Sequence, residues 1–87
     1  MGSKIATKGM FQMKILKVVP DDGRFITAYF DNNHWIKVDM KDKLQTARFS
    51  NLRNVELFMA PKTDGRAILW SGGISIGISE LMEMASR

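Results

Sequence analysis

A period-two series of apolar residues between Arg24 and Met40 is the strongest constraint on how this chain can fold. Successive side chains of a β-strand point to opposite faces of its sheet, so this spacing predicts strands that bury one face. A polar cluster at 31–34 divides the series into two strands. The residues of the predicted buried face are Ile26, Ala28, Phe30, Ile36, Val38 and Met40.

A third strand is predicted before this pair. The segment from Met13 to Val19 is rich in β-branched and long apolar residues, and the turn-forming segment 20–23 follows it directly. Pro20 presets φ for a tight turn, and Gly23 can take the positive φ that closes a hairpin with a bulge. We therefore expect the first half of the chain to form a three-stranded antiparallel meander.

A short central helix is predicted after a charged crossing segment. Ser50 and Asn54 can each cap a helix, because their side-chain oxygens accept hydrogen bonds from the free amides of a first turn. The residues expected to face inward from this helix are Leu52, Val55, Leu57 and Phe58.

A second hairpin and a final helix complete the predicted elements. The ranges 57–60 and 66–70 flank an Asp-Gly turn signal, and from about Ile78 to Ala85 the apolar residues recur on one helical face. The predicted fold class is α+β, with one antiparallel sheet of about five strands, a meander followed by a hairpin. The short central helix and the C-terminal helix accompany this sheet, and the latter packs on one face.

Length and composition favour one small domain. A chain of 87 residues with 45% hydrophobic residues can build one thin core. We expect residues 1–12 to be a flexible leader and residues 13–87 to be a single domain. No apolar run approaches the roughly 20 residues of a transmembrane helix, so no membrane association is expected. The lack of cysteine excludes disulfides and favours a cytoplasmic location.

The sequence holds no recognisable catalytic or metal-binding arrangement. Its single histidine, His34, stands in a polar turn without a second histidine or a cysteine to complete a zinc site. Gly73-Ile74-Ser75-Ile76-Gly77 has the Gly-x-Ser-x-Gly spacing, but His34 is the only histidine that could serve a serine nucleophile as its base. The glycine-rich segment 71–77 also lacks the Gly-Lys-Ser/Thr ending of a phosphate-binding loop. We therefore expect a non-enzymatic protein without a metal ion or a cofactor.

The sheet face opposite the predicted core is the remaining candidate site. Phe25, Tyr29 and Trp35 project from it, and such a face either packs against another element or a second subunit, or stays open and binds a protein partner. Interleaved basic residues also suit a stacking platform for single-stranded nucleic acid. The candidate anion-binding residues are Lys14, Lys17, Arg24 and Lys37.

Several short motifs resemble those of one bacterial family. In chain order they are Lys37-Val38-Asp39-Met40, Phe49-Ser50-Asn51-Leu52-Arg53-Asn54-Val55-Glu56-Leu57-Phe58, Ile68-Leu69-Trp70-Ser71-Gly72-Gly73-Ile74 and Leu81-Met82-Glu83. Over about Met13 to Ala85 this order is similar to that of the domain of unknown function 2442 family. The resemblance implies a compact α+β domain, found alone or joined to a helix-turn-helix segment. It also implies a gene beside that of another small protein, in a toxin and antitoxin type of arrangement, and no catalytic residue.

Most of the matched residues are bulky and apolar, which indicates packing. Trp70 precedes a glycine-rich turn and is a further candidate partner-binding residue, because Trp is enriched at interaction hot spots. The sequence therefore predicts a protein-interaction or regulatory module of an antitoxin-like kind, which binds a protein partner or forms a homo-oligomer. The alternative is nucleic-acid or anionic-ligand binding through the basic, aromatic sheet face.

Overall fold

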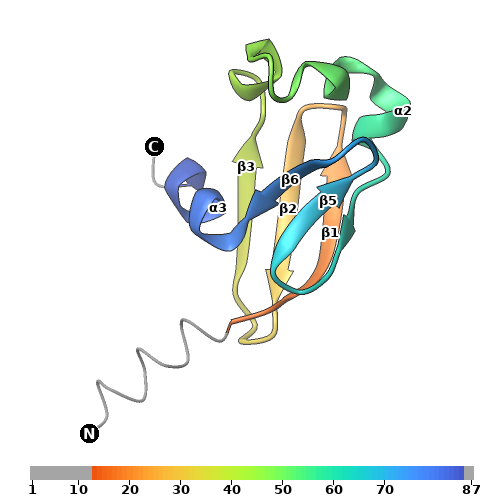
Figure 1. Cartoon of the computed structure of the whole chain (residues 1–87). Coiled ribbons are helices and arrows are strands. Elements are labelled where there is room, and N and C mark those ends of the chain that lie inside the picture. The colour runs from red at the N-terminus through yellow and green to blue at the C-terminus, as the bar shows by residue number, and fades with distance from the viewer. Residues whose placement is uncertain (1–12, 86–87) are drawn as a thin grey trace, which may run out of the picture.

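A computed structural model describes residues 13–85 as two three-stranded antiparallel sheets and a C-terminal helix (Figure 1). Sheet A contains, in spatial order, β1 (Ile15–Asp21), β2 (Phe25–Phe30) and β3 (Trp35–Asp39). Two 3-10 helices, η1 (Lys43–Gln45) and η2 (Ser50–Arg53), and a short helix, α2 (Val55–Phe58), lead to the second sheet. Sheet B contains β4 (Lys62–Thr63), β5 (Ala67–Trp70) and β6 (Ile74–Gly77), and α3 (Ile78–Ala85) follows. The predicted leader at 1–12 lies outside the described residues.

The β1–β2 connection comprises residues 22–24, since Asp21 pairs with Phe25. The turn predicted at 20–23 starts too early, because Pro20 and Asp21 belong to β1. Asp22 and Gly23 have φ values of 56° and 65°, and the Arg24 amide donates to the Asp21 carbonyl at 3.0 Å. Two positive φ values are typical of a type I′ turn, whose twist matches that of the paired strands. Pro20 instead lies within β1, which tolerates it because an edge strand can lack an outward amide.

The β2–β3 turn places an asparagine in the left-handed conformation. The Phe30 carbonyl accepts a hydrogen bond from the Asn33 amide at 3.2 Å, and the Phe30 amide donates to the His34 carbonyl at 2.9 Å. Asn33 has a φ of 69°. This is a three-residue turn that ends in a bulge, where glycine is the usual residue and asparagine is the best-tolerated substitute.

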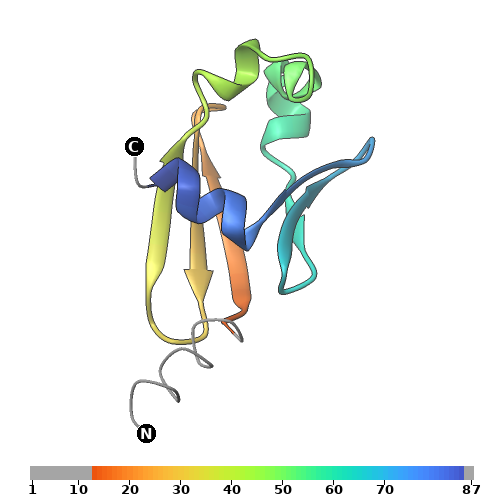
Figure 2. The same cartoon turned by 60° about the vertical axis from the view of Figure 1, so that its left-hand side comes forward.

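The predicted meander and its buried face are confirmed, with one exception. Ile36 is only half-buried, because it lines a hollow beside the start of β3, whereas Val38 on the same strand is buried. Figures 1 and 2 show α3 and sheet B on the same side of sheet A, and we call the side that they cover the inner face. The core side chains from both layers are Met13, Ile15, Ile26, Ala28, Phe30, Val38, Met40, Phe49, Leu52, Phe58, Ile68, Trp70, Ile74, Ile76 and Leu81.

The second half differs from the prediction in how its strands are arranged. It forms a separate sheet, which brings the strands to six in two sheets rather than about five in one. The range 57–60 is not a strand, because α2 occupies most of it, and the hairpin begins at Lys62. Ile74–Gly77, expected only to approach the last helix, pairs with β5 as β6. The predicted bounds of the last helix, Ile78–Ala85, are those of α3.

The central helix is confirmed only in part. The Asn54 side chain caps α2 by accepting a hydrogen bond from the Leu57 amide at 3.3 Å. Ser50 does not cap a helix, because its hydroxyl donates to the Ala47 carbonyl at 3.1 Å. Val55 was expected inside but is 59% exposed at the start of this one-turn helix, in which Phe58 is the buried residue.

Polar contacts tie the connecting segments to the two layers. The Ile15 amide of β1 donates to the Gly65 carbonyl in the β4–β5 turn at 2.8 Å, which joins sheet A to sheet B. Arg48 in the crossing segment forms two hydrogen bonds with the Glu80 carboxylate of α3, at 2.7 and 2.8 Å, and donates to the Ser75 carbonyl at 2.7 Å. The crossing segment is therefore attached to both β6 and α3.

The turn at Asn33 gives a test of the meander. Asn33→Ala should lower the free energy of unfolding by about 1 kcal/mol, because alanine tolerates the left-handed conformation less well than asparagine does. Asn33→Gly should be at least as stable as the parent, since glycine adopts this conformation without a steric penalty. Urea denaturation measures both, with Asn51→Ala as the control asparagine outside the turn. Equal stability of the Asn33→Ala variant and the parent would contradict this turn.

Candidate partner-binding surface

The side of sheet A away from α3 and sheet B is the candidate surface, and we call it the outer face. The register of the strands brings its residues together, with Tyr29 opposite both Lys17 and Trp35. Three of the predicted partner-binding residues, Phe25, Tyr29 and Trp35, therefore share one face. The outer face consists of Lys17, Val19 and Asp21 from β1, Phe25, Thr27 and Tyr29 from β2, and Trp35, Lys37 and Asp39 from β3.

The three aromatic rings of the outer face differ in how accessible they are. Trp35 is 61% exposed, whereas Phe25 and Tyr29 are half-buried. The Lys17 ammonium lies 4.8 Å from the centre of the Tyr29 ring, and the Lys37 ammonium lies 4.8 Å from that of Phe25. Both distances fit cation–π contacts, which partly cover these two rings. Trp35 is therefore the aromatic side chain that the outer face offers most openly.

Arg24 and Asp39 form the main ion pair of the outer face. The guanidinium donates to both carboxylate oxygens, at 2.9 and 2.7 Å, and its carbon lies 4.9 Å from the centre of the Phe25 ring. This hydrogen bonding lowers the pKa of Asp39 to about 2, with a further contribution from the Lys41 amide, which donates to the same carboxylate at 2.9 Å. The charge of Arg24 is therefore matched within the protein.

The predicted anion-binding residues do not form one cluster of free cations. Arg24 is paired with Asp39, and Lys14 lies before β1, where its amide donates to the Asp31 carboxylate at 3.2 Å. Lys17 and Lys37 remain on the outer face, and neither takes part in the ion pairs found among residues 13–85. The face thus carries two available cations over aromatic rings.

Trp70 does not belong to this surface, which corrects the prediction that it is a partner-binding residue. Its side chain is 4% exposed, and its indole N–H donates to the Phe58 carbonyl at 3.1 Å. The ring centres of Trp70 and Phe58 lie 6.4 Å apart. Ile68 and Trp70 are two residues apart, so on one strand their side chains point to the same face. Both are buried in β5, and this spacing in the sequence could have indicated that Trp70 is buried.

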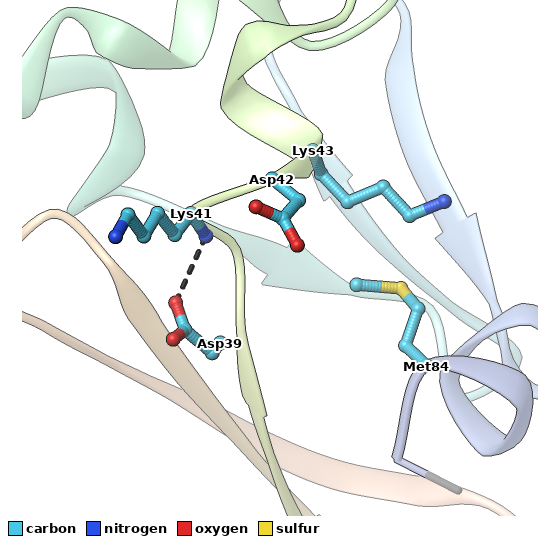
Figure 3. Close-up of a pocket in the computed structure, with 5 residues that line it drawn as sticks. All are labelled: Asp39, Lys41, Asp42, Lys43 and Met84. Atoms are coloured by element: carbon cyan, nitrogen blue, oxygen red, sulfur yellow. Dashed lines mark hydrogen bonds between the residues drawn. The ribbon is translucent and has the colours of Figure 1, made fainter. Parts of the chain in front are cut away.

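Two hollows beside β3 were missed by the sequence analysis. The larger, of about 390 Å³, lies between the start of β3 and α3, and Trp35, Ile36 and Met82 contribute to its mainly apolar wall. The smaller, of about 250 Å³, lies beyond the end of β3 between Lys41 and Met84 (Figure 3). Neither could be found from spacing alone, because each depends on how α3 is placed over the sheet.

The described part of the chain shows no arrangement for metal binding. No three His, Cys, Asp or Glu side chains within residues 13–85 come together as a metal site requires. His34 is exposed in the turn before β3, where it lines the larger hollow. Among the described helices none has the length and apolar character needed to cross a membrane.

Comparison with protein-family models, with curated proteins and with solved structures found no match to this chain. The resemblance to the domain of unknown function 2442 family therefore stays a prediction that rests on the motifs alone.

The Arg24–Asp39 pair predicts a specific pH dependence of stability. The pKa of Asp39 lies below its unfolded value of about 3.9, so its charged form stabilises the fold above that pH, and this contribution is lost as the pH falls toward 2. We expect Asp39→Asn to be less stable than the parent at about pH 6 and to approach it near pH 2. Urea denaturation at several pH values measures the difference.

Arg24→Gln is the matched control for this experiment. It removes the larger cause of the lowered pKa while leaving the carboxylate in place, so it should lose much of the same pH dependence. An equal difference between the parent and Asp39→Asn at every pH would show that the charge of Asp39 contributes nothing to stability.

Proposed function

We propose that this protein is a non-enzymatic interaction module that binds a protein partner through the outer face of sheet A. The exposure of Trp35 carries this proposal, because this large aromatic side chain is 61% accessible and lies opposite Tyr29, on the face that also holds Phe25. Exposed apolar patches of this kind mark protein-interaction sites, and Trp is among the residues that contribute most to binding.

The distribution of charge supports a protein partner over nucleic acid. A stacking platform needs open ring faces for bases and free cations for phosphates. Here Lys37 and Arg24 both lie over the Phe25 ring, and Lys17 lies over the Tyr29 ring. Two carboxylate residues of β1 and β3 stand on the same face and oppose the approach of phosphates. A mixed surface with one open indole suits a protein surface better.

Nucleic-acid or anionic-ligand binding is the second candidate. Lys17 and Lys37 favour it, since both are exposed and neither belongs to an ion pair found in residues 13–85. The antitoxin-like role is also part of the proposal, and it rests on the family resemblance of the motifs. Its partner would be a small protein encoded beside this one.

Capture from native lysate, with and without nuclease, distinguishes the two candidates. The partner should be lost with Trp35→Ala and retained at high salt, because truncating an aromatic hot spot removes about 2 kcal/mol or more, whereas salt weakens mainly phosphate contacts. The captured protein is then identified by mass spectrometry, and its affinity is measured with purified components.

Met59→Ala serves as the matched control, because Met59 is also an exposed apolar residue, at 43%, and follows α2 instead of lying on sheet A. This variant should bind as the parent does. Equal loss with both variants would argue against a site on the outer face. Recovery of nucleic acid that high salt removes would favour the second candidate instead.

A further inference from the structure

The outward edge of β3 carries backbone groups without a partner strand. β3 is the last strand of sheet A, and no strand of residues 13–85 pairs with its far side. Hydrogen bonds from the Phe30 amide to the His34 carbonyl and from the Met40 amide to the Arg24 carbonyl show that the even-numbered residues face β2. Alternate residues of an edge strand point their amides and carbonyls away from the sheet. The odd-numbered residues of β3, which are Trp35, Lys37 and Asp39, therefore present these groups outward.

An edge of this kind is a template for another extended strand, and natural proteins often protect such edges with a lysine. Lys37 lies in the middle of β3 and has this position. It would oppose its own copy if two β3 strands paired with their centres aligned, and two like charges directly opposite each other are destabilising. Lys37 thus disfavours that register without blocking the edge.

A shift of the two-fold axis by one residue turns the repulsion into attraction. With Val38 on the axis, Lys37 lies opposite Asp39 of the second copy, and Asp39 lies opposite Lys37 of the second copy. The pairing repeats by symmetry, so both lysines meet the carboxylate of Asp39, which also accepts hydrogen bonds from Arg24 of its own copy. Trp35 then lies next to the end of β3 of the second copy, where Lys41 follows the strand and can make a cation–π contact. The side chains of Trp35, Lys37, Asp39 and Lys41 are all exposed.

We propose that two copies of this chain associate through antiparallel pairing of their β3 strands, with Lys37 of each copy opposite Asp39 of the other. The two sheets A would form one continuous six-stranded sheet. A two-fold symmetric interface uses the same surface of both copies. β3 suits such an interface, because a two-fold rotation about Val38 places Lys37 of each copy opposite Asp39 of the other. This proposal concerns the strand edge and does not rest on the proposed function of the outer face.

The surroundings of the edge agree with this occupant. The apolar hollow lies beside Trp35 and Ile36 at the start of β3, and the smaller hollow lies beside Asp39 and Lys41 at its end. Antiparallel pairing brings the start of one β3 strand next to the end of the other. The apolar hollow of each copy would therefore lie near the smaller hollow of the second copy. Met82 of α3, 37% exposed in the wall of the apolar hollow, would lie near this interface.

Charge reversal tests the register with the full chain. Lys37→Glu places two carboxylates opposite each other in a pair of identical copies, and Asp39→Lys places two ammonium groups opposite each other. Each variant alone should dimerise roughly tenfold more weakly than the parent, because the symmetric pair would contain two positions at which like charges lie opposite each other. An equal mixture of the two variants should dimerise again. In the mixed pair the introduced glutamate faces the introduced lysine, and the unchanged Asp39 of one copy faces the unchanged Lys37 of the other.

Sedimentation equilibrium over a wide concentration range measures the association, and thermal unfolding checks that each variant is folded. A parent that stays monomeric throughout, or a mixture no better than its components, overturns the proposal. Binding of the edge to a different protein instead of a second copy would give the monomeric outcome.

A second pair of variants keeps the test informative if Asp39→Lys fails to fold, because that change also removes the partner of Arg24. Lys37→Pro deletes the outward amide and leaves the β2–β3 ladder intact, since proline is tolerated on an edge strand. Lys37→Ala removes the same side chain and keeps the amide. Dimerisation should be weaker for Lys37→Pro than for Lys37→Ala, and equal dimerisation would contradict strand pairing.

Discussion

The burial of the inner face of sheet A beneath α3 and sheet B is the interaction on which the rest of the structure depends. A chain of 87 residues can build one thin core, and this core lies between the two layers. Phe30, Met40 and Leu81 are buried in it from three different parts of the chain. Sheet B and α3 both pack on the inner face of sheet A. None of the described strands or helices therefore covers its outer face.

The composition of the outer face follows from that constraint. Half-buried aromatic residues on an uncovered sheet would expose much apolar surface, and here the side chains of Lys17, Lys37 and Arg24 lie over two of the rings. Their aliphatic parts shield the rings while the charged ends reach water. Trp35 is not covered in this way, which makes it the most open apolar side chain of the face. The same strand presents its unpaired backbone edge, so β3 carries both features on which the proposals rest.

The first half could be predicted well from the sequence, because its strands pair with their neighbours in the chain and each strand follows from the spacing of its own apolar residues. The spacing of Ile26, Ala28 and Phe30 sets the inner face, and a one-residue slip of the register would turn all three to the outside. The turn was less predictable: Pro20 has the same fixed φ in a turn and in an edge strand, so its position alone did not distinguish them. The bounds of α3 followed from a regular apolar stripe.

The second half was harder because it depends on contacts between distant segments. The range Ile74–Gly77 is too short for its apolar pattern alone to predict a strand. It forms the strand β6 because it pairs with β5. Trp70 is buried because Phe58 offers it both a ring and a carbonyl acceptor, twelve residues away in the chain. The candidate partner-binding residues on the outer face could be named in advance, but whether the face is open depends on what the second layer covers.

Fluorescence quenching of the two tryptophans tests most directly the claim that the described elements, within residues 13–85, cover sheet A on one side only. Trp70→Phe leaves Trp35 as the emitter, and Trp35→Phe leaves Trp70. In dilute solution Trp35 should emit at long wavelength and be quenched strongly by acrylamide, whereas Trp70, with its N–H bonded to Phe58, should emit at shorter wavelength and be quenched weakly. Equal protection of both indoles would contradict an open outer face.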